Sequence, residues 1–496
     1  MSLIRSLGWM FVLTLMGVVS LGAACGKSGS ASNSDAGAPD SGGDARPTLN
    51  IAWDWAGIIG TGQSLSVGAF GSDSPATQPY NNLKLKLGTL DVSTFDPTTA
   101  DPASAELAML PLAEPIRSAP GGYPSAYPRN IDGVTPHSAM ADEVTVLAMN
   151  ASAPDYVTVH SVVGESGQPM TVIDKAATQV TVPCQGSSAA GFTCSMGRAY
   201  ASTLYEVTAI SKLAAAAGKT YGVGAITLIH GESDAGNMGY ADDIFQLWSD
   251  YNQDISAITK QTASIPMLVS QQNSVPSSAG QVSVSAAQQV QVGLDHPGDV
   301  VCVGPKYQYP YSPGVGNNGV HLTSHGYELL GEKMGQVYFE RVVAGHDWQP
   351  LQPTSGERMG ASVLLVHFHV PVPPLAWDDT LPAPHAAAGT LAAWTLGRGF
   401  EVTAAGVRAT INSVEIIGGD TVQITCQDDL TGKAVGVAYA MTTDGTMLAT
   451  SPFASADTGG TGTFRWGHLK DSDPFAGSVT SVVQPNYCVA FQLSIP

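Results

Sequence analysis

Basic residues are scarce in this chain. Its 496 residues include 21 Lys and Arg against 41 Asp and Glu, which gives a formal net charge of −20 at pH 7, and charged residues make up only 12%. Nucleic-acid binding needs cations that neutralise phosphates, and binding to anionic lipid needs clusters of the same side chains. The composition therefore argues against a nucleic-acid partner and against a basic membrane-binding surface.

Cysteine is also rare, and its spacing excludes one common metal site. The chain has 6 cysteines and no CxxC pair, so a zinc ribbon is not expected. Cys184 and Cys194 flank a loop rich in Gly and Ser, whereas Cys426 and Cys488 lie in two strand-like stretches. In an oxidising compartment each pair is a candidate disulfide. Cys302 is then left over, and we expect it to be buried.

One long apolar run stands at the N-terminus. Arg5 precedes the run Leu7–Val19, and small residues follow at 22–24, before Cys25. This order is typical of a secretory signal, with a membrane anchor of about 18 residues as the alternative. The residues around Cys25 resemble a bacterial lipobox, except that Leu21 stands four residues before the Cys instead of three. Both lipidation of Cys25 and plain cleavage after residue 24 remain open, and either predicts an exported protein, secreted or bound to the cell envelope. Membrane contact is expected only through a lipid at Cys25.

The rest of the chain divides into three stretches. Residues 26–48 consist mainly of Gly, Ser, Ala, Asp and Pro, and such a segment cannot bury enough apolar surface to offset chain entropy. We expect a disordered linker there, after a signal at residues 1–25. Residues 49–345 alternate apolar and amphipathic segments, and residues 346–496 begin with proline clusters and become rich in β-forming residues.

The stretch 49–345 has the pattern of an α/β domain. Five short runs are nearly continuous in apolar character, as parallel strands covered on both faces are: Ile51–Ile59, Tyr156–Val163, Tyr221–Ile229, Ile265–Ser270 and Val300–Val303. Three segments between or after them have helical spacing: Arg198–Ala217, Ala241–Thr259 and Ser324–Val343. This alternation predicts a three-layer α/β domain.

The stretch 346–496 has the pattern of a β-sandwich. Its β-rich runs are Val407–Ile417, Thr421–Cys426, Gly436–Met441 and Tyr487–Ile495. The turn Gly418-Gly419-Asp420 between the first two predicts a hairpin.

Three short motifs fall where an open parallel sheet places its chemistry. Gly62-Gln63-Ser64-Leu65-Ser66-Val67-Gly68 follows the first predicted strand, His230-Gly231-Glu232-Ser233-Asp234 follows the third, and Asn318-Gly319-Val320-His321 precedes the last helix. Ligands of such sheets bind at the carboxyl ends of the strands. Taken singly, each motif has an ordinary structural explanation as a turn, a helix cap or a loop histidine. Together they bring a Ser, a Glu and a His to one edge, which is the set that acyl transfer through a covalent intermediate requires.

In this order the three motifs resemble those of the SGNH (GDSL-type) hydrolases. The similarity covers about residues 55–340 and is greatest to the carbohydrate acetylesterases that include sialate O-acetylesterases and acetylxylan esterases. The resemblance implies a flavodoxin-like three-layer sandwich with a five-stranded parallel sheet. It also implies Ser64 as nucleophile, His321 as general base and acid, and Glu232 as the acid of the triad. The implied oxyanion donors are the backbone N–H groups of Ser64 and Gly167, with Gly164 as the alternative to Gly167.

Two positions depart from the family pattern. Asn318 stands where these enzymes commonly have Asp, and Asn cannot offset the charge of an imidazolium. His230 stands where the acetylesterase branch usually has Gln. Both are candidates for contact with the substrate or the oxyanion.

The function that we expect from the sequence is removal of O-acetyl groups from an acetylated carbohydrate, without a metal or organic cofactor. The alternatives are a surface carbohydrate-binding protein with a weak or inactive hydrolase domain, and an esterase or lipase of broader acyl range.

Overall fold

The computed structural model describes residues 49–71, 77–88, 95–117, 127–175, 181–183, 193–195, 197–273, 282–312, 320–385, 391–443 and 465–496. Thr48–Pro496 forms one compact unit. The expected signal, the linker and Asn318 lie outside the described residues, and so does Cys184, one partner of the expected Cys184–Cys194 disulfide. Among the helices of the described ranges, none has the length and apolar character needed to cross a bilayer.

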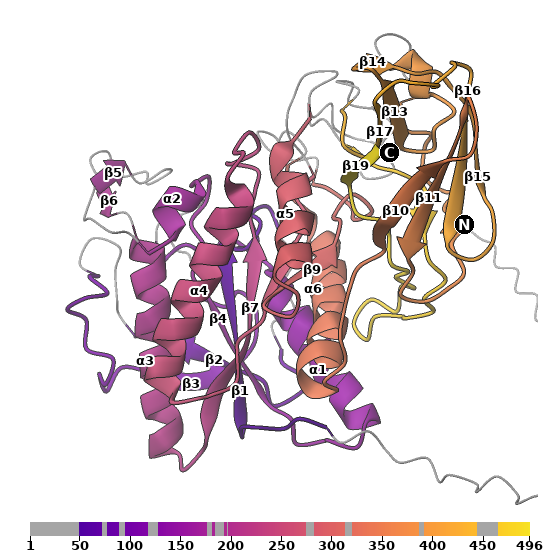
Figure 1. The fold of residues 1–496 in the computed structure, drawn as a ribbon. Helices are drawn as coiled ribbons and strands as arrows, with labels where there is room; N and C mark the ends of the chain where they lie inside the picture. Colours follow the sequence, from indigo (N-terminus) through magenta and orange to yellow (C-terminus); the bar gives the residue numbers. More distant parts are fainter. Residues whose placement is uncertain are drawn as a thin grey trace, which may run out of the picture. The chain divides into compact units, whose positions relative to one another are not determined.

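A seven-stranded, mostly parallel sheet forms the centre of the α/β region (Figure 1). Its strands, in the order β3-β2-β4-β1-β7-β8-β9, are Ala108–Pro111, Leu83–Lys86, Thr158–Val162, Trp55–Gly62, Tyr221–Ile229, Met267–Ser270 and Val300–Gly304. Only the pairing of β2 with β3 is antiparallel. The five apolar runs predicted as strands correspond to β1, β4, β7, β8 and β9, which are neighbours. The sheet is larger than the expected five strands because β2 and β3 extend one edge, and their partly exposed, Lys-containing sequence gave no apolar run.

Helices cover both faces of this sheet. Ile58 and Ile59 are adjacent on β1 and point to opposite faces, so each belongs to a different hydrophobic cluster. The cluster of Ile58 includes residues of α1 (Pro136–Asn150) and α6 (Ser324–Tyr338), and α6 continues into a short π-helix, Phe339–Val343. The cluster of Ile59 includes residues of α3 (Arg198–Ala216) and α4 (Tyr240–Thr259). Two further helices, α2 (Met170–Ile173) and α5 (Val284–Asp295), lie in the same region.

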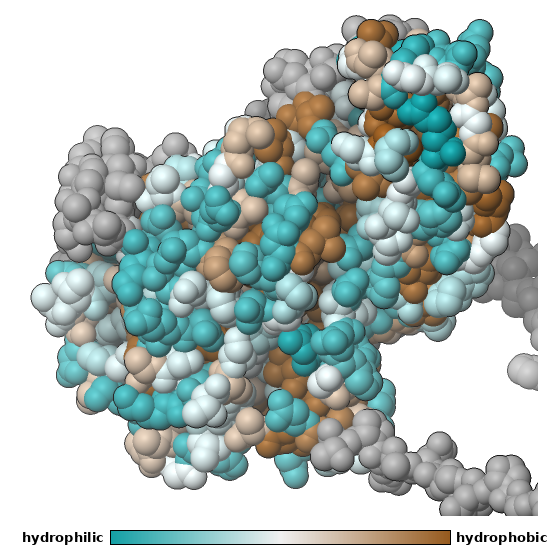
Figure 2. Space-filling view, in the orientation of Figure 1, coloured by the Kyte–Doolittle hydropathy of each residue, from teal (hydrophilic) through white to brown (hydrophobic). Residues whose placement is uncertain are grey.

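The three predicted helical segments are confirmed as α3, α4 and α6, whereas α1 and α5 were not predicted. Helix α1 buries polar residues such as His137, Glu143 and Thr145 as well as apolar ones, so its sequence shows no simple apolar stripe. On the face that Figure 2 shows, hydrophilic side chains cover most of the surface over α3 and α4, with smaller apolar patches. This agrees with the amphipathic pattern of α4, which buries Ile244, Leu247 and Tyr251.

The C-terminal region consists mainly of two four-stranded antiparallel sheets. One has the order β10-β11-β16-β15, with bounds Gln352–Arg358, Val363–His369, Thr421–Cys426 and Ile411–Ile416. The other has the order β14-β13-β17-β19, with bounds Val407–Arg408, Phe400–Ala404, Val435–Tyr439 and Phe491–Ile495. Phe368 of the first sheet packs against Phe400 and Phe491 of the second, with ring centroids 6.4 and 6.0 Å apart. The two sheets therefore face one another across an aromatic core, and the predicted hairpin joins β15 to β16.

The predicted disulfide between Cys426 and Cys488 is wrong. Both side chains are buried free thiols. Cys426 ends β16 of one sheet, whereas Cys488 precedes β19 of the other, and the sulfur of Cys488 lies 3.4 Å from the carbonyl oxygen of Val489. Two strand-like stretches were taken to be partners, and the structure places them in different sheets. Cys302, on β9, is also a buried free thiol, as expected.

Candidate active site

Ser64 lies in the turn that follows β1. The last residue of that strand, Gly62, has a φ of 133°, and a Cβ on it would lie 2.1 Å from the carbonyl oxygen of Ile229 on β7. Only glycine accommodates both the backbone angle and this contact. The carbonyl of Ser64 accepts hydrogen bonds from the N–H groups of Val67 and Ala69 at 3.3 and 3.1 Å. The turn therefore holds Ser64 at the carboxyl end of β1, where it is 4% exposed.

His321 lies just before α6 and faces Ser64. Its Nε2 is 2.7 Å from Oγ of Ser64, although the two residues are 257 positions apart in sequence. The ring of Phe70 packs against the imidazole with centroids 5.0 Å apart. Thr323 caps α6, because its hydroxyl accepts from the N–H of Gly326 at 3.0 Å. The structure thus brings the predicted nucleophile and the predicted base within hydrogen-bonding distance.

The surroundings of His321 favour its neutral form. Burial lowers the pKa of His321 from 6.5 to about 4, and the negative charge of Glu232 acts in the opposite direction. A neutral imidazole with a ring nitrogen at a serine hydroxyl is able to accept the proton of that hydroxyl.

Glu232 acts on His321 through its charge. It follows β7, and its side chain is 5% exposed. Its Oε2 accepts from Nε2 of Gln63 at 3.0 Å, and its Oε1 lies 3.2 Å from Nζ of Lys306. Within the described ranges these two are its hydrogen-bond partners. The carboxylate is therefore oriented by Gln63 and Lys306 and not by a hydrogen bond to the imidazole.

Gln63 and Lys306 are site residues that sequence reasoning missed. Lys306 comes two residues after β9 and is fully buried, with its ammonium paired to Glu232. Gln63 bridges two motifs, because its Oε1 accepts from the N–H of Ser233 at 3.2 Å while its amide nitrogen donates to Glu232. The signal for Lys306 was available in its position: a polar residue directly after a buried parallel strand falls on the same sheet edge as Ser64.

Ser64 and Gly167, whose backbone N–H groups are the predicted oxyanion donors, lie in loops at this edge of the sheet. In the described part of the chain, neither the N–H of Ser64 nor that of Gly167 makes a hydrogen bond. Gly167 has a φ of 70°, a conformation that glycine adopts at little cost. The alternative, Gly164, accepts from Nδ2 of Asn130 at 2.8 Å through its carbonyl, and its N–H also makes no hydrogen bond within the described residues. Backbone N–H groups without an acceptor are the kind of donor that stabilises a developing oxyanion.

His230 makes a different contribution from the one expected. It is fully buried, with Nε2 2.9 Å from the carbonyl oxygen of Gln168 and Nδ1 2.7 Å from the hydroxyl of Tyr240. Because a carbonyl only accepts, Nε2 carries the proton and the tyrosine hydroxyl donates to Nδ1. Both ring nitrogens are thus engaged within the protein, which leaves none for substrate. The imidazole instead fixes Gln168, the residue after Gly167.

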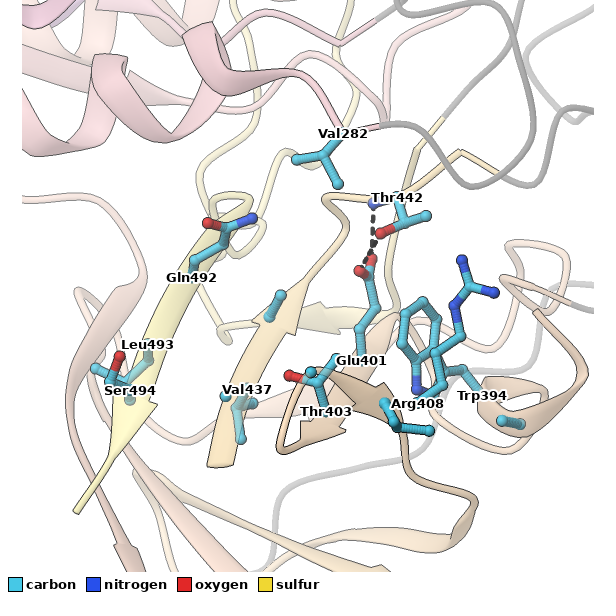
Figure 3. A pocket seen from close by; sticks show the side chains of 15 residues that line it. Val282, Trp394, Glu401, Thr403, Arg408, Val437, Thr442, Gln492, Leu493 and Ser494 are labelled. Atoms are coloured by element: carbon cyan, nitrogen blue, oxygen red, sulfur yellow. Dashed lines mark hydrogen bonds between the residues drawn. The ribbon is translucent and has the colours of Figure 1, made fainter. Parts of the chain in front are cut away.

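A cavity of about 1020 Å³ is lined mainly by residues of the C-terminal region, and Ser64 is not among the residues that line it (Figure 3). The buried carboxylate of Glu401 lines it and accepts from the N–H of Met441 at 2.9 Å and from the N–H and hydroxyl of Thr442. Burial alone would raise the pKa of Glu401, but the hydrogen bonds from His385 and Thr442 outweigh it and hold that pKa below its usual value. Trp394 donates its indole N–H to Val402 at 3.0 Å. The buried polar groups of this wall are therefore paired within the protein.

Within the residues that the structure describes, no group of three or more His, Cys, Asp and Glu side chains is placed to hold a metal ion.

No family model and no curated protein matches this chain. Among solved structures, a carbohydrate acetylesterase from Xanthomonas citri is similar to it with a TM-score of 0.49 and 11% identity, over 88% of this chain and 80% of that one. A protein from Arabidopsis thaliana gives a TM-score of 0.37 and 16% identity, over 60% and 99%. A carbohydrate acetylesterase from Sinorhizobium meliloti gives 0.27 and 10%, over 57% and 97%. These likenesses are too distant to carry an argument about activity, which depends on the geometry of the site.

Proposed function

We propose that this protein is a serine carboxylesterase of the SGNH type that removes O-acetyl groups from carbohydrate, of the sialate or acetylxylan kind, through an acyl-enzyme. The observation that carries the proposal is the 2.7 Å distance between Oγ of Ser64 and Nε2 of His321 at the carboxyl edge of a mostly parallel sheet. The neighbouring strands β4-β1-β7-β8-β9 have the order 2-1-3-4-5 when numbered along the chain, which supports a flavodoxin-like assignment. The choice of an acetylated carbohydrate as substrate comes from the resemblance of the motifs around Ser64, Glu232 and His321 to those of carbohydrate acetylesterases.

In the first half of the proposed reaction, Oγ of Ser64 attacks the carbonyl carbon of the acetyl ester while Nε2 of His321 takes the hydroxyl proton. The carbonyl oxygen becomes an oxyanion and accepts hydrogen bonds from the N–H groups of Ser64 and Gly167. His321 then gives its proton to the departing sugar oxygen, which leaves as an alcohol. Glu232 stabilises the imidazolium through its charge.

In the second half, His321 takes a proton from water as the water oxygen attacks the acetyl-serine carbonyl. The second oxyanion uses the same two N–H groups. Collapse releases acetic acid, which loses its proton to solvent, and the proton on His321 returns to Oγ of Ser64. No oxidant, reductant or metal ion enters this balance.

The test is hydrolysis of p-nitrophenyl acetate and of acetylated xylan by the parent protein, by Ser64→Ala and by Ser494→Ala, whose serine is exposed on β19. We expect Ser64→Ala to lower kcat by about 10⁴-fold or more and Ser494→Ala to retain parental activity. Preference for acetate over butyrate esters would separate a deacetylase from a broader esterase. Folded parent protein without activity on either ester would contradict the proposal and favour the carbohydrate-binding alternative.

Export by residues 1–25, with acetylated carbohydrate outside the cytoplasm as the substrate, is part of the same proposal.

A further inference from the structure

The C-terminal region places one arginine side chain against the active-site edge of the α/β region. Arg465 is 2% exposed. Its guanidinium donates to the carbonyl and side-chain oxygens of Gln272, at 3.0 and 2.7 Å, and to the carbonyl of Asn273 at 3.0 Å. Gln272 and Asn273 follow β8 within three residues of its end. Arg465 therefore fixes the chain where β8 leaves the sheet, on the edge that also carries Ser64.

A chain of hydrogen bonds links Asn273 to Lys306, the residue that pairs with Glu232. Nδ2 of Asn273 donates to the hydroxyl of Tyr311 at 3.4 Å, and that hydroxyl donates to the carbonyl of Lys306 at 3.2 Å. The ammonium of Lys306 lies 3.2 Å from the carboxylate of Glu232. Each link is a side chain bound to the next group, so the position of Asn273 bears on where Lys306 and Glu232 lie.

The same segment supports the histidine. Tyr311 forms an isolated β-bridge with Leu322, and the N–H of Ser312 donates to the carbonyl of His321 at 2.7 Å. The backbone at the carbonyl of His321 and at Leu322 is thus tied to residues 311–312. Tyr311 connects this support to the residues that Arg465 holds.

Two more hydrogen-bonded contacts join the C-terminal region to this edge. The side chain of Gln271 and the backbone of Ala490 exchange two hydrogen bonds, both 2.7 Å long. The hydroxyl of Tyr307 donates to the carbonyl of Cys488 at 2.6 Å. Gln271 precedes Gln272 and Tyr307 follows Lys306, so these contacts flank the ones made by Arg465.

The positive charge of Arg465 also interacts with the carboxylate of Glu232 at the candidate active site. Burial lowers the pKa of Arg465 to about 10, and the carboxylates of Glu401 and Glu232 oppose that effect. At neutral pH the guanidinium is a buried cation, and within the described residues it donates to Gln272, Asn273 and Met441. Such charge-assisted bonds are short and directional, which suits a residue that fixes a loop.

We propose that Arg465 is a positioning residue of the esterase, and that the C-terminal region is thereby part of the catalytic unit. The inference rests on the proposed function and extends it to a region that holds neither Ser64 nor His321. Arg465 fixes the end of β8, and Tyr311 transmits that position to Lys306 and to the backbone of His321. Displacement of catalytic groups by about 1 Å can lower a rate about 10²-fold.

The test compares full-length Arg465→Met with Arg408→Met. Arg408 lies on β14 of the same region, with its guanidinium 5.2 Å from the centre of the Trp394 ring. For Arg465→Met we expect kcat on p-nitrophenyl acetate to fall about 10²-fold with KM unchanged. The rate at which a fluorophosphonate labels Ser64 should fall by the same factor in folded protein. Arg465→Lys should recover part of both rates, and Arg408→Met should match the parent.

A parental kcat and labelling rate in folded Arg465→Met would overturn the inference while leaving the Ser64 mechanism in place. Failure of the parent to hydrolyse the ester or to be labelled would instead refute the proposed function, and this inference with it. If Arg465→Met does not fold, Tyr307→Phe is the second test of the inference. This variant removes the hydroxyl that donates to the carbonyl of Cys488, another contact between the C-terminal region and the active-site edge. A lower kcat at unchanged KM and melting temperature would support the inference, and a parental kcat would refute it.

Discussion

The sheet edge around Ser64 and the cavity of the C-terminal region differ in how their polar groups are paired. In the cavity wall, Glu401 receives two hydrogen bonds from Thr442 (Figure 3) and one from the N–H of Met441. The indole N–H of Trp394 donates to the carbonyl of Val402. At the sheet edge, Ser64 faces an imidazole, and two N–H groups of the described chain have no acceptor.

This difference indicates that a large cavity volume and a buried carboxylate are not enough to identify a reactive site. A wall whose buried polar groups are satisfied gains little from a charged or polar ligand, because existing bonds would have to be broken. A nucleophile held against a neutral base, next to donors without acceptors, is ready to stabilise a charge that forms during reaction. We therefore assign chemistry to the sheet edge and not to the cavity.

The strongest test of the comparison is to remove the charge of Glu232. We expect Glu232→Gln to lower kcat by roughly 10²-fold or more, because the imidazolium loses its nearby anion and Lys306 is left as a buried cation without a partner. Steady-state kinetics on p-nitrophenyl acetate would measure this loss. The double variant Glu232→Gln/Lys306→Met removes both charges and controls for folding, and we expect it to recover stability without activity. Asn318→Ala should be far less harmful, and equal activities of Glu232→Gln and the parent would refute the role of Glu232.

The pH dependence of kcat/KM also tests the role of Glu232, because it predicts the direction in which the acid limb should move. His321 must be neutral to act as base, and its pKa is lowered to about 4, so kcat/KM should fall as the pH drops through about 4. Glu232 raises the pKa of His321, so Glu232→Gln should move this limb to lower pH. A limb that moves to higher pH would contradict the arrangement.

A smaller effect is expected at Gly167, the second of the proposed oxyanion donors. Gly167→Ala places a side chain at a φ of 70°, which shifts the backbone N–H, and loss of one such donor lowers kcat roughly 10²-fold. Gly432→Ala is the matched control, because Gly432 has a φ of 69° and open space around it, remote from Ser64. Comparison of kcat and melting temperature for the two variants separates backbone strain from loss of the donor. Equal kcat values would assign the oxyanion to another group.

The smallest effect belongs to the cavity. Gln492 is exposed on β19 and lines it. Gln492→Ala should leave kcat/KM for p-nitrophenyl acetate within about twofold of the parent, as surface substitutions usually change little. A loss comparable with that of Gly167→Ala would break the distinction between the two regions.

The groups that sequence alone brought together are those whose placement follows from topology. Ser64 and His321 were placed at one edge because parallel strands end on the same side of a sheet, and no knowledge of side-chain contacts was needed. Whether Glu232 acts on His321 through a hydrogen bond or through its charge depends on interatomic distances. Strand order does not predict those distances. The Lys306 ion pair and the inward use of both nitrogens of His230 were missed for that reason. The false pairing of Cys426 with Cys488 has the same origin, since strand-forming residues do not reveal which sheet they join.

His230 has one more consequence. By binding Gln168 on one side and Tyr240 of α4 on the other, it ties the glycine loop to a long helix before any substrate arrives. A donor set that is fixed in advance needs no loop closure on binding, so none of the affinity for the ester is lost to ordering it. In the proposed reaction, recognition of the sugar and chemistry at the acetyl group could then vary independently, because the same pre-arranged donors would serve different leaving alcohols.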